Sequence, residues 1–198
     1  MKTSILTLTF ALSALLGFSN TTHAAVPGKE VVTVLNQQVA ISKIEVRGNV
    51  ELYVSDGADD QVKVYNNYYS ESAMVQGQDG TLRIASYSDQ KLVVWVTSNS
   101  LQKLSVYDNA SVRSFGKLST IELHVDLYNN ASAKLDLDAF AINVKLHDRA
   151  KADLSGTVSR ADLACDYSST LNYAALSSEQ LNKKVNFDEP KENLVATR

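Results

Sequence analysis

The chain has 198 residues, of which 44% are hydrophobic and 21% are charged, and its formal net charge is −3. Nucleic acid and anionic lipid are therefore not expected as partners, because both require a concentrated basic face. The only cysteine is Cys165, so no disulfide can form within the chain, and stability must come from packing and hydrogen bonds.

The N-terminus has the layout of a secretory signal peptide. Lys2 precedes an apolar run from Ile5 to Phe18, and a small residue, Ala24, marks a cleavage site. The run is shorter than the roughly 20 residues of a membrane-spanning helix, and no second apolar run follows. We predict a signal peptide at 1–24, no transmembrane segment, and export to the periplasm or the cell surface.

The rest of the chain is expected to be one all-β domain. Val50, Leu52 and Val54 alternate with polar neighbours, and this period of two is typical of strands, whereas no helical pattern is present. Clusters of Asp, Asn and Gly separate the strand-like stretches and predict turns. We expect an exit segment or first strand at 25–40, a β domain at 41–176, and a polar C-terminal cap and tail at 177–198.

A short repeat begins at residue 104. The stretch from Leu104 to Ser111 is echoed from positions 125, 144 and 163, at spacings of 21, 19 and 19 residues. A period near 20 fits one rung of a β-solenoid, in which parallel strands stack about 4.8 Å apart. The alternative is an antiparallel β-sandwich, which would also show alternating strands but does not predict a repeating corner.

In a solenoid, equivalent positions of the repeat form straight columns. Two apolar columns would point inward, and two columns would form a corner with polar residues and a tight bend. The inward columns are Leu104, Val125, Val144, Leu163 and Val106, Leu127, Leu146, Cys165, and the corner columns are Asp108, Asn129, Asp148, Tyr167 and Ala110, Ala131, Ala150, Ser169.

The sequence resembles a bacterial family called putative auto-transporter adhesin, head GIN domain. The likeness rests on the stretches Lys43–Leu52 and Gly80–Ile84 and on the later Asn-Ala-Ser corners, and it covers roughly residues 40–175. The resemblance implies a right-handed parallel β-helix, exported or surface-associated, with an adhesin role. Many members carry Ser-Gly-Ala-Gly at the corners, where this chain has Asp108–Ser111, and the family supplies no catalytic residues.

The most distinctive candidate binding feature is an outward column at the corner. It is formed by Tyr107, Tyr128 and His147, and the polar residues Asp108, Asn129 and Asp148 follow them. Stacked aromatic side chains on a rigid sheet can bind sugar rings or an apolar partner surface. The alternative is that these cross-rung pairs only stabilise the sheet. Tyr65, Tyr68 and Tyr69 form a second candidate patch.

Catalytic and metal sites are not expected. The acidic residues at neighbouring rungs could act on a sugar or hold calcium, but no calcium-loop spacing is present, and such residues also keep an exposed face soluble. His124 and His147 lack a metal-ligand spacing, and Cys165 occupies an inward position. The acidic candidates are Asp108, Asp126, Asp148, Asp153 and Asp166, with Arg149 as an anion contact.

These patterns favour an exported, non-enzymatic adhesin or scaffold protein without a cofactor. Its partner would be a glycan or an envelope protein. The alternative function is a carbohydrate-active β-helix protein that binds or cleaves polysaccharide. Assembly into a homo-oligomer is a further alternative, because the last rung of a solenoid exposes an unpaired strand edge.

Overall fold

A computed structural model describes residues 32–36, 40–65 and 73–186 of the chain, and within these ranges the regular structure consists of β-strands. The early strands are short, whereas the last four each contain at least 15 residues. The strands are β1 (Val32–Asn36), β2 (Lys43–Gly48), β3 (Val50–Ser55), β4 (Gln61–Tyr65), β5 (Ala73–Gln78), β6 (Thr81–Ser86), β7 (Leu92–Thr97), β8 (Lys103–Val106), β9 (Ser111–Leu127), β10 (Ser132–Leu146), β11 (Lys151–Asp166) and β12 (Thr170–Asn186).

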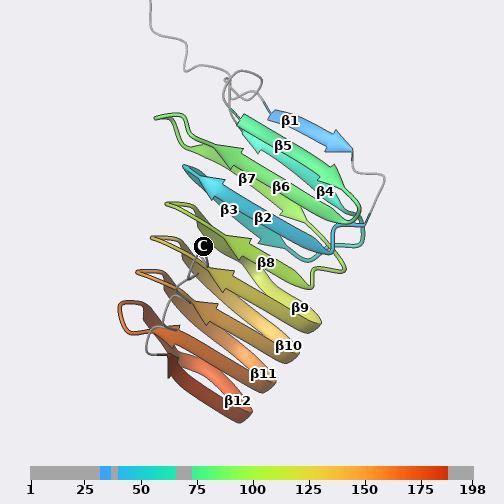
Figure 1. Cartoon of the computed structure of the whole chain (residues 1–198). Helices are drawn as coiled ribbons and strands as arrows, with labels where there is room; N and C mark the ends of the chain where they lie inside the picture. Colours follow the sequence, from blue (N-terminus) through green and yellow to red (C-terminus); the bar gives the residue numbers. More distant parts are fainter. Residues whose placement is uncertain (1–31, 37–39, 66–72, 187–198) are drawn as a thin grey trace, which may run out of the picture.

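All strands belong to one curled, open sheet (Figure 1). One arm of the sheet has the strand order β1-β4-β7-β3 and the other has the order β8-β2-β6-β5. The long strand β9 joins the two arms, because its first part pairs with β3 and its last part pairs with β8. Strands β10, β11 and β12 stack below β9 in sequence order.

The repeat of the sequence corresponds to the parallel register of the long strands. Val125 on β9 pairs with Val144 on β10, and Val144 pairs with Leu163 on β11. The same register places Leu127, Leu146 and Cys165 in a row. The expected inward columns are confirmed, because all of these side chains are buried.

The first half of the domain continues the parallel stack. Strands β2 and β3 form one bent unit that lies between the unit β6–β7 and the unit β8–β9, with parallel pairing on both sides. Beyond β6 and β7 the pairing becomes antiparallel, through β5 on one arm and β4 and β1 on the other. The N-terminal end of the stack is therefore covered by antiparallel strands, whereas β12 pairs only with β11 among the described strands.

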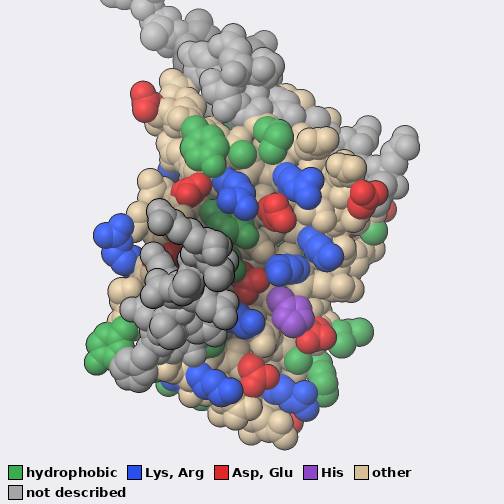
Figure 2. All heavy atoms as spheres, in the orientation of Figure 1, with side chains coloured by type: hydrophobic (Ala, Val, Ile, Leu, Met, Phe, Trp, Pro, Cys, Tyr) green, Lys and Arg blue, Asp and Glu red, His purple; other side chains and the backbone are tan. Residues whose placement is uncertain are grey.

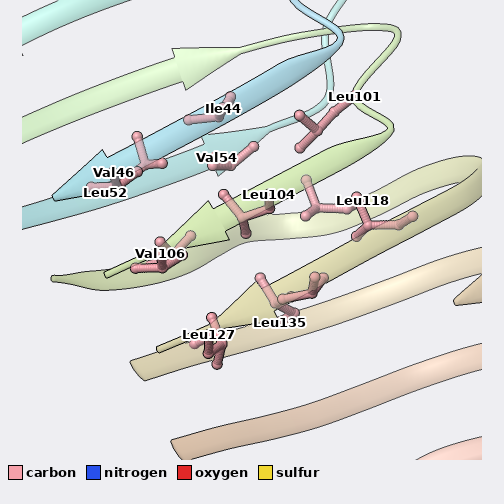
Figure 3. Close-up of a cluster of buried hydrophobic side chains, with 14 of the residues drawn as sticks. Ile44, Val46, Leu52, Val54, Leu101, Leu104, Val106, Leu118, Leu127 and Leu135 are labelled. Carbon is pink, nitrogen blue, oxygen red and sulfur yellow. The ribbon is translucent and has the colours of Figure 1, made fainter. Parts of the chain in front are cut away.

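The core lies between the two arms. Figure 3 shows Ile44, Val54 and Leu104 pointing into this space from β2, β3 and β8. These side chains are almost completely buried, and the same cluster continues to Leu163 on β11. Since burial of apolar surface contributes roughly 25 cal/mol per Å², this continuous core is the main source of stability in a chain without a disulfide.

The prediction of an all-β fold is confirmed. The more specific prediction of a right-handed parallel β-helix stays a prediction, and so does its alternative, the antiparallel sandwich. Strand β12 extends to Asn186, so part of the predicted polar cap at 177–198 is a strand. The predicted signal peptide, most of the exit segment at 25–40, and Tyr68 and Tyr69 lie outside the described residues. Within the described ranges, no helix has the length and apolarity needed to cross a membrane.

Candidate functional site

The corner column predicted from the sequence is a continuous stack of side chains. The ring centroids of Tyr107 and Tyr128 are 4.7 Å apart, and those of Tyr128 and His147 are 4.5 Å apart, with the planes within 6° of parallel. The guanidinium carbon of Arg47 lies 3.8 Å from the centroid of Tyr107. The stack therefore runs over four rungs, and both faces of the two tyrosine rings are in contact with a neighbour in the stack.

The polar corner residues hold neighbouring rungs together. Asp108, Asn129 and Asp148 all have φ near +60°, a conformation that Asn and Asp tolerate better than most residues. The Nδ2 of Asn129 donates to Oδ1 of Asp108 at 3.1 Å, and the backbone N–H of Asn129 donates to Oδ2 of Asp148 at 3.0 Å. Three consecutive corners are therefore linked through one residue, Asn129, by its side chain on one side and its backbone N–H on the other.

The alanines after these residues form the predicted tight bend. Ala110, Ala131 and Ala150 are fully buried, and each donates its N–H to the carbonyl oxygen three residues before it, at 3.1–3.2 Å. Tyr167 occupies the equivalent of the polar position on the last corner and is 78% exposed. The corner therefore has a repeated backbone geometry that the Asp-Asn-Ala-Ser pattern supports.

Burial and charge raise the pKa of two side chains, Tyr128 in the stack and Lys103 beside it. Partial burial, and secondarily the carboxylate of Asp126, raise the pKa of the Tyr128 hydroxyl. Asp126 also accepts a hydrogen bond from Lys103, with 3.1 Å between Nζ and Oδ2, and this contact raises the pKa of the lysine. His147 lies 3.7 Å from Asp166, measured from Nδ1 to Oδ2. The corner is thus a network of mutually satisfied groups.

The corner column offers mainly ring edges and polar turn groups to a ligand, because both ring faces of Tyr107 and of Tyr128 are covered. Asn129 and Asp148 are exposed, whereas Tyr107, Tyr128 and His147 are half-buried. A sugar ring cannot lie flat on the rings of Tyr107 and Tyr128, because both faces of each ring are already in contact with a neighbour. Any ligand at this corner would have to bind along the column from the side.

The other residues considered for catalysis or metal binding do not come together into one site among the described residues. Within the described ranges, no group of three or more His, Cys, Asp or Glu side chains could hold a metal ion. Asp126 and Asp153 are each paired with a lysine, Lys103 and Lys134 respectively. Cys165 is buried, as its inward position predicted. Arg149 donates to the amide oxygen of the neighbouring corner residue Asn130 at 3.0 Å.

A second aromatic group, which the sequence analysis missed, lies on the other arm of the sheet. The rings of Tyr53 and Trp95 stack with 4.7 Å between centroids, and Phe115 tilts against Trp95 at 5.1 Å. Tyr65, a member of the second predicted patch, lies 6.3 Å from Trp95. Phe115 is 62% exposed, so part of this group remains open to solvent.

A bulge in β9 positions Phe115 beside Trp95. Arg113 pairs with Lys134 and Lys117 pairs with Asp136, so β9 uses two more residues than β10 between the same two rows. Gly116 adopts φ +81°, which allows the chain to turn out of the sheet. The extra residues explain why the first spacing of the repeat is 21 and the others are 19, and this difference was the signal that could have located the site.

Trp95 and Tyr53 of the aromatic group belong to a continuous outward row of side chains, which we call the aromatic–basic column. Strand pairing aligns its members in one row across β4, β7, β3, β9, β10, β11 and β12. They are, in spatial order, Lys63, Trp95, Tyr53, Arg113, Lys134, Asp153 and Asn172.

A shallow trough of about 380 Å³ lies beside the basic part of this column. One wall is formed by Arg113, Lys134 and Asp153, and the other by the parallel row that contains Ser132 and Lys151. Small buried residues of β9, β10 and β11 lie between the two rows: Val112, Ala133 and Ala152. The trough thus has small residues between its walls, and the walls carry three basic side chains and one acidic side chain.

The other arm of the sheet carries charges of both signs. On the face shown in Figure 2, Lys and Arg side chains are interspersed with Asp and Glu. Pairs such as Arg83–Glu45 and Lys103–Asp126, at 3.4 and 3.1 Å, belong to strands of that arm or to its junction with β9. Mixed charges of this kind keep a sheet surface soluble without attracting one sign of ligand.

Comparison with known proteins identifies the family of the chain. The chain is similar to a putative adhesin from Parabacteroides merdae ATCC 43184, with 15% identity, a TM-score of 0.61, and coverage of 82% of this chain and 80% of the other. A putative lipid binding protein from Parabacteroides distasonis ATCC 8503 has 12% identity and a TM-score of 0.61, with coverage of 80% and 79%. A putative adhesin from the same organism has 22% identity, a TM-score of 0.50 and the same coverage.

At these identities the structural likeness establishes the fold alone. No curated protein matches the chain. The model of the family described as "Putative auto-transporter adhesin, head GIN domain" matches residues 40–186, which include nearly all of the described strands. The resemblance noted in the sequence is thereby confirmed, and the chain belongs to this family.

Proposed function

We propose that the chain is an exported, non-enzymatic binding protein of the adhesin type. Its body is a right-handed parallel β-helix of about 20 residues per rung that presents straight outward columns to a glycan or protein at the bacterial envelope. The observation that carries the proposal is the parallel register of β9 to β12, which turns a short repeat into rows of similar side chains. The family description, which names an adhesin, supports it.

The corner column is one contact line in this proposal. Its polar members Asp108, Asn129 and Asp148 would bind a partner from the side, together with the ring edges of Tyr107, Tyr128 and His147. Repeated contacts on a rigid surface favour a polymeric partner, because each additional contact on a linked ligand forms at high effective concentration. The rigidity of the stacked strands also lowers the entropic cost of binding.

A glycan array on purified residues 25–198, with calcium present, tests both the binding and the absence of catalysis. We expect retention without release of reducing or unsaturated ends, and weaker retention for Tyr107→Ala and Tyr128→Ala. The matched variants Tyr107→Phe and Tyr128→Phe keep the ring stack and remove only the hydroxyl groups. Turnover that disappears in Asp148→Ala would contradict the proposal and support a carbohydrate-active enzyme.

Export is tested separately on the product made in a bacterial host. We expect the protein in the periplasmic or surface fraction, with an N-terminus at Ala25 by sequencing of the purified product. A product that keeps Met1 and remains in the cytoplasm would contradict the export part of the proposal.

A further inference from the structure

We propose that the trough beside the aromatic–basic column binds an acidic linear polysaccharide, that is, a chain of pyranose rings that carry carboxylate or sulfate groups. This inference rests on the proposed function and names the ligand class and its place. The trough is distinct from the corner column, since it lies on the arm of the sheet that contains β3 and β7, whereas the stack of the corner begins at Arg47 on β2.

The first argument is the sign of the charge. Three basic side chains, Arg113, Lys134 and Lys151, line the trough, against one acidic side chain, Asp153. Arg113 is paired with Glu51 on the neighbouring strand β3, with 3.6 Å between Nε and Oε1, so the two lysines supply the excess positive charge. The whole chain has a net charge of −3, so this concentration of positive charge departs from the average surface. Charge complementarity therefore favours an anionic ligand.

The second argument is that part of this charge is not neutralised. Lys151 is exposed and forms no ion pair with any described residue, and the Nζ of Lys134 lies 3.9 Å from Asp153, at the limit of an ion pair. Asp153 is also bound by Asn172, whose Nδ2 donates to Oδ1 at 3.0 Å. Both lysines can therefore turn toward a ligand with little loss of existing contacts.

The third argument is the aromatic group at one end of the same row. Tyr53 pairs directly with Arg113, so Trp95, Tyr53 and Arg113 follow one another across β7, β3 and β9. The bulge of β9 adds the exposed ring of Phe115. Exposed aromatic rings bind the apolar C–H faces of pyranose rings, and bulges are often found where a strand directs a side chain toward a ligand.

The fourth argument is the spacing of the row. Neighbouring rungs of a parallel stack lie about 4.8 Å apart, a distance comparable to the length of one pyranose ring along a linear polysaccharide. Arg113 on β9 and Lys134 on β10 are neighbours in one row and can therefore meet the acidic groups of successive sugars, while Lys151 faces the ligand from the other row. A duplex or single-stranded nucleic acid is a poorer match, because its binding requires a longer basic surface than three side chains provide.

The test is equilibrium binding of residues 25–198 to three soluble polymers: polygalacturonate, heparin and neutral dextran. We expect binding to polygalacturonate or heparin, weakening as salt increases, and none to dextran. Preference between the first two identifies carboxylate or sulfate as the recognised group. Equal binding to dextran would overturn the inference, and so would binding to a single-stranded DNA of similar length at comparable affinity.

Charge-reversal variants locate the site. The double variant Lys134→Glu/Lys151→Glu is expected to weaken binding of the acidic polymer by about tenfold or more. Lys145→Glu, an exposed lysine on the part of β10 that belongs to the other arm, is the matched control and should leave binding unchanged. Because all three lysines are on the surface, unfolding is not expected, and a thermal melt checks this.

A separate variant tests the aromatic end of the aromatic–basic column. Phe115→Ala removes an exposed ring without touching the charges and is expected to weaken binding severalfold while the salt dependence stays the same. Equal effects of Lys145→Glu and the double variant would show that the trough is not the site. If the array shows binding that depends on Tyr107 and Tyr128 alone, this inference fails and the proposed function stands, whereas no retention of any glycan would contradict the glycan arm of the proposed function itself.

Discussion

The ring of Tyr128 lies parallel to the ring of Tyr107, with 4° between the planes and 4.7 Å between the centroids. The two residues are one rung apart, since the parallel register aligns Val106 with Leu127 immediately before them. This pair shows how a 21-residue spacing in the sequence becomes a direct contact in the fold.

The stacked pair is predicted to stabilise the domain. In a double-mutant cycle of Tyr107→Leu and Tyr128→Leu, we expect a coupling free energy of about 1 kcal/mol, because an aromatic pair contributes more than the burial of its separate rings. The measurement is urea denaturation of the four proteins. Additive effects of the two substitutions would show that the rings do not stabilise each other.

Asn129 is predicted to tolerate glycine better than alanine. Both substitutions remove the hydrogen bond from Nδ2 to Asp108, but alanine keeps a Cβ at φ +60°, whereas glycine removes it and with it the strain. We expect Asn129→Ala to lower the free energy of unfolding by about 1 kcal/mol more than Asn129→Gly does. Equal losses in chemical denaturation would mean that the backbone at this corner can relax out of the left-handed conformation.

Two glycines with positive φ are predicted to differ in their response to alanine. A Cβ at Gly156 would lie 2.0 Å from the carbonyl oxygen of Leu137, whereas a Cβ at Gly116 would meet no atom within 4 Å. We expect Gly156→Ala to cost more than about 3 kcal/mol and Gly116→Ala about 1 kcal/mol. Thermal melts of both variants measure this, and similar costs would contradict the close approach of β10 and β11 at Leu137.

The domain is predicted to lose stability in alkali. The hydrogen bond to Glu51 raises the pKa of Tyr53, burial raises that of Tyr128, and the hydrogen bond to Asp126 raises that of Lys103. The folded state then holds these protons to higher pH than the unfolded state does. Their contribution to the free energy of unfolding is therefore fully present below about pH 10, and it is lost as the pH rises through the folded pKa values.

Denaturation at a series of pH values between about 9 and 12 measures this loss. The double variant Tyr53→Phe/Tyr128→Phe should show a shallower fall, while Tyr87→Phe, at an exposed tyrosine outside the two contacts, serves as the control. A stability that is constant across this range would contradict the raised pKa values.

The repeat allowed the inward columns and the corner to be predicted from the sequence. Alternation and a fixed spacing identify Val125 and Val144 as stacked core residues, and the parallel register places them so. The same repeat spacing predicted that Tyr107 lies beside Tyr128. The repeat could not show that the ring faces of the tyrosines would be covered within the stack. Their exposure depends on ring orientation and on Arg47, which is distant in the sequence.

The aromatic–basic column could not be predicted in the same way. Trp95, Tyr53 and Arg113 come from three separate strands, and β3 lies between β7 and β9 only because the chain returns past it twice. Such a row depends on long-range strand order, which local periodicity does not contain. Only the two-residue difference in spacing around Phe115 was visible in the sequence.

A crystal structure of residues 25–198 with a galacturonate oligosaccharide tests the central claim, that the outward rows of the stack form a binding surface and not a catalytic one. We expect an intact oligosaccharide along the trough, with carboxylates within hydrogen-bonding distance of Lys134 and Lys151. An oligosaccharide that is cleaved, or that binds away from the outward rows while the trough stays empty, would contradict it.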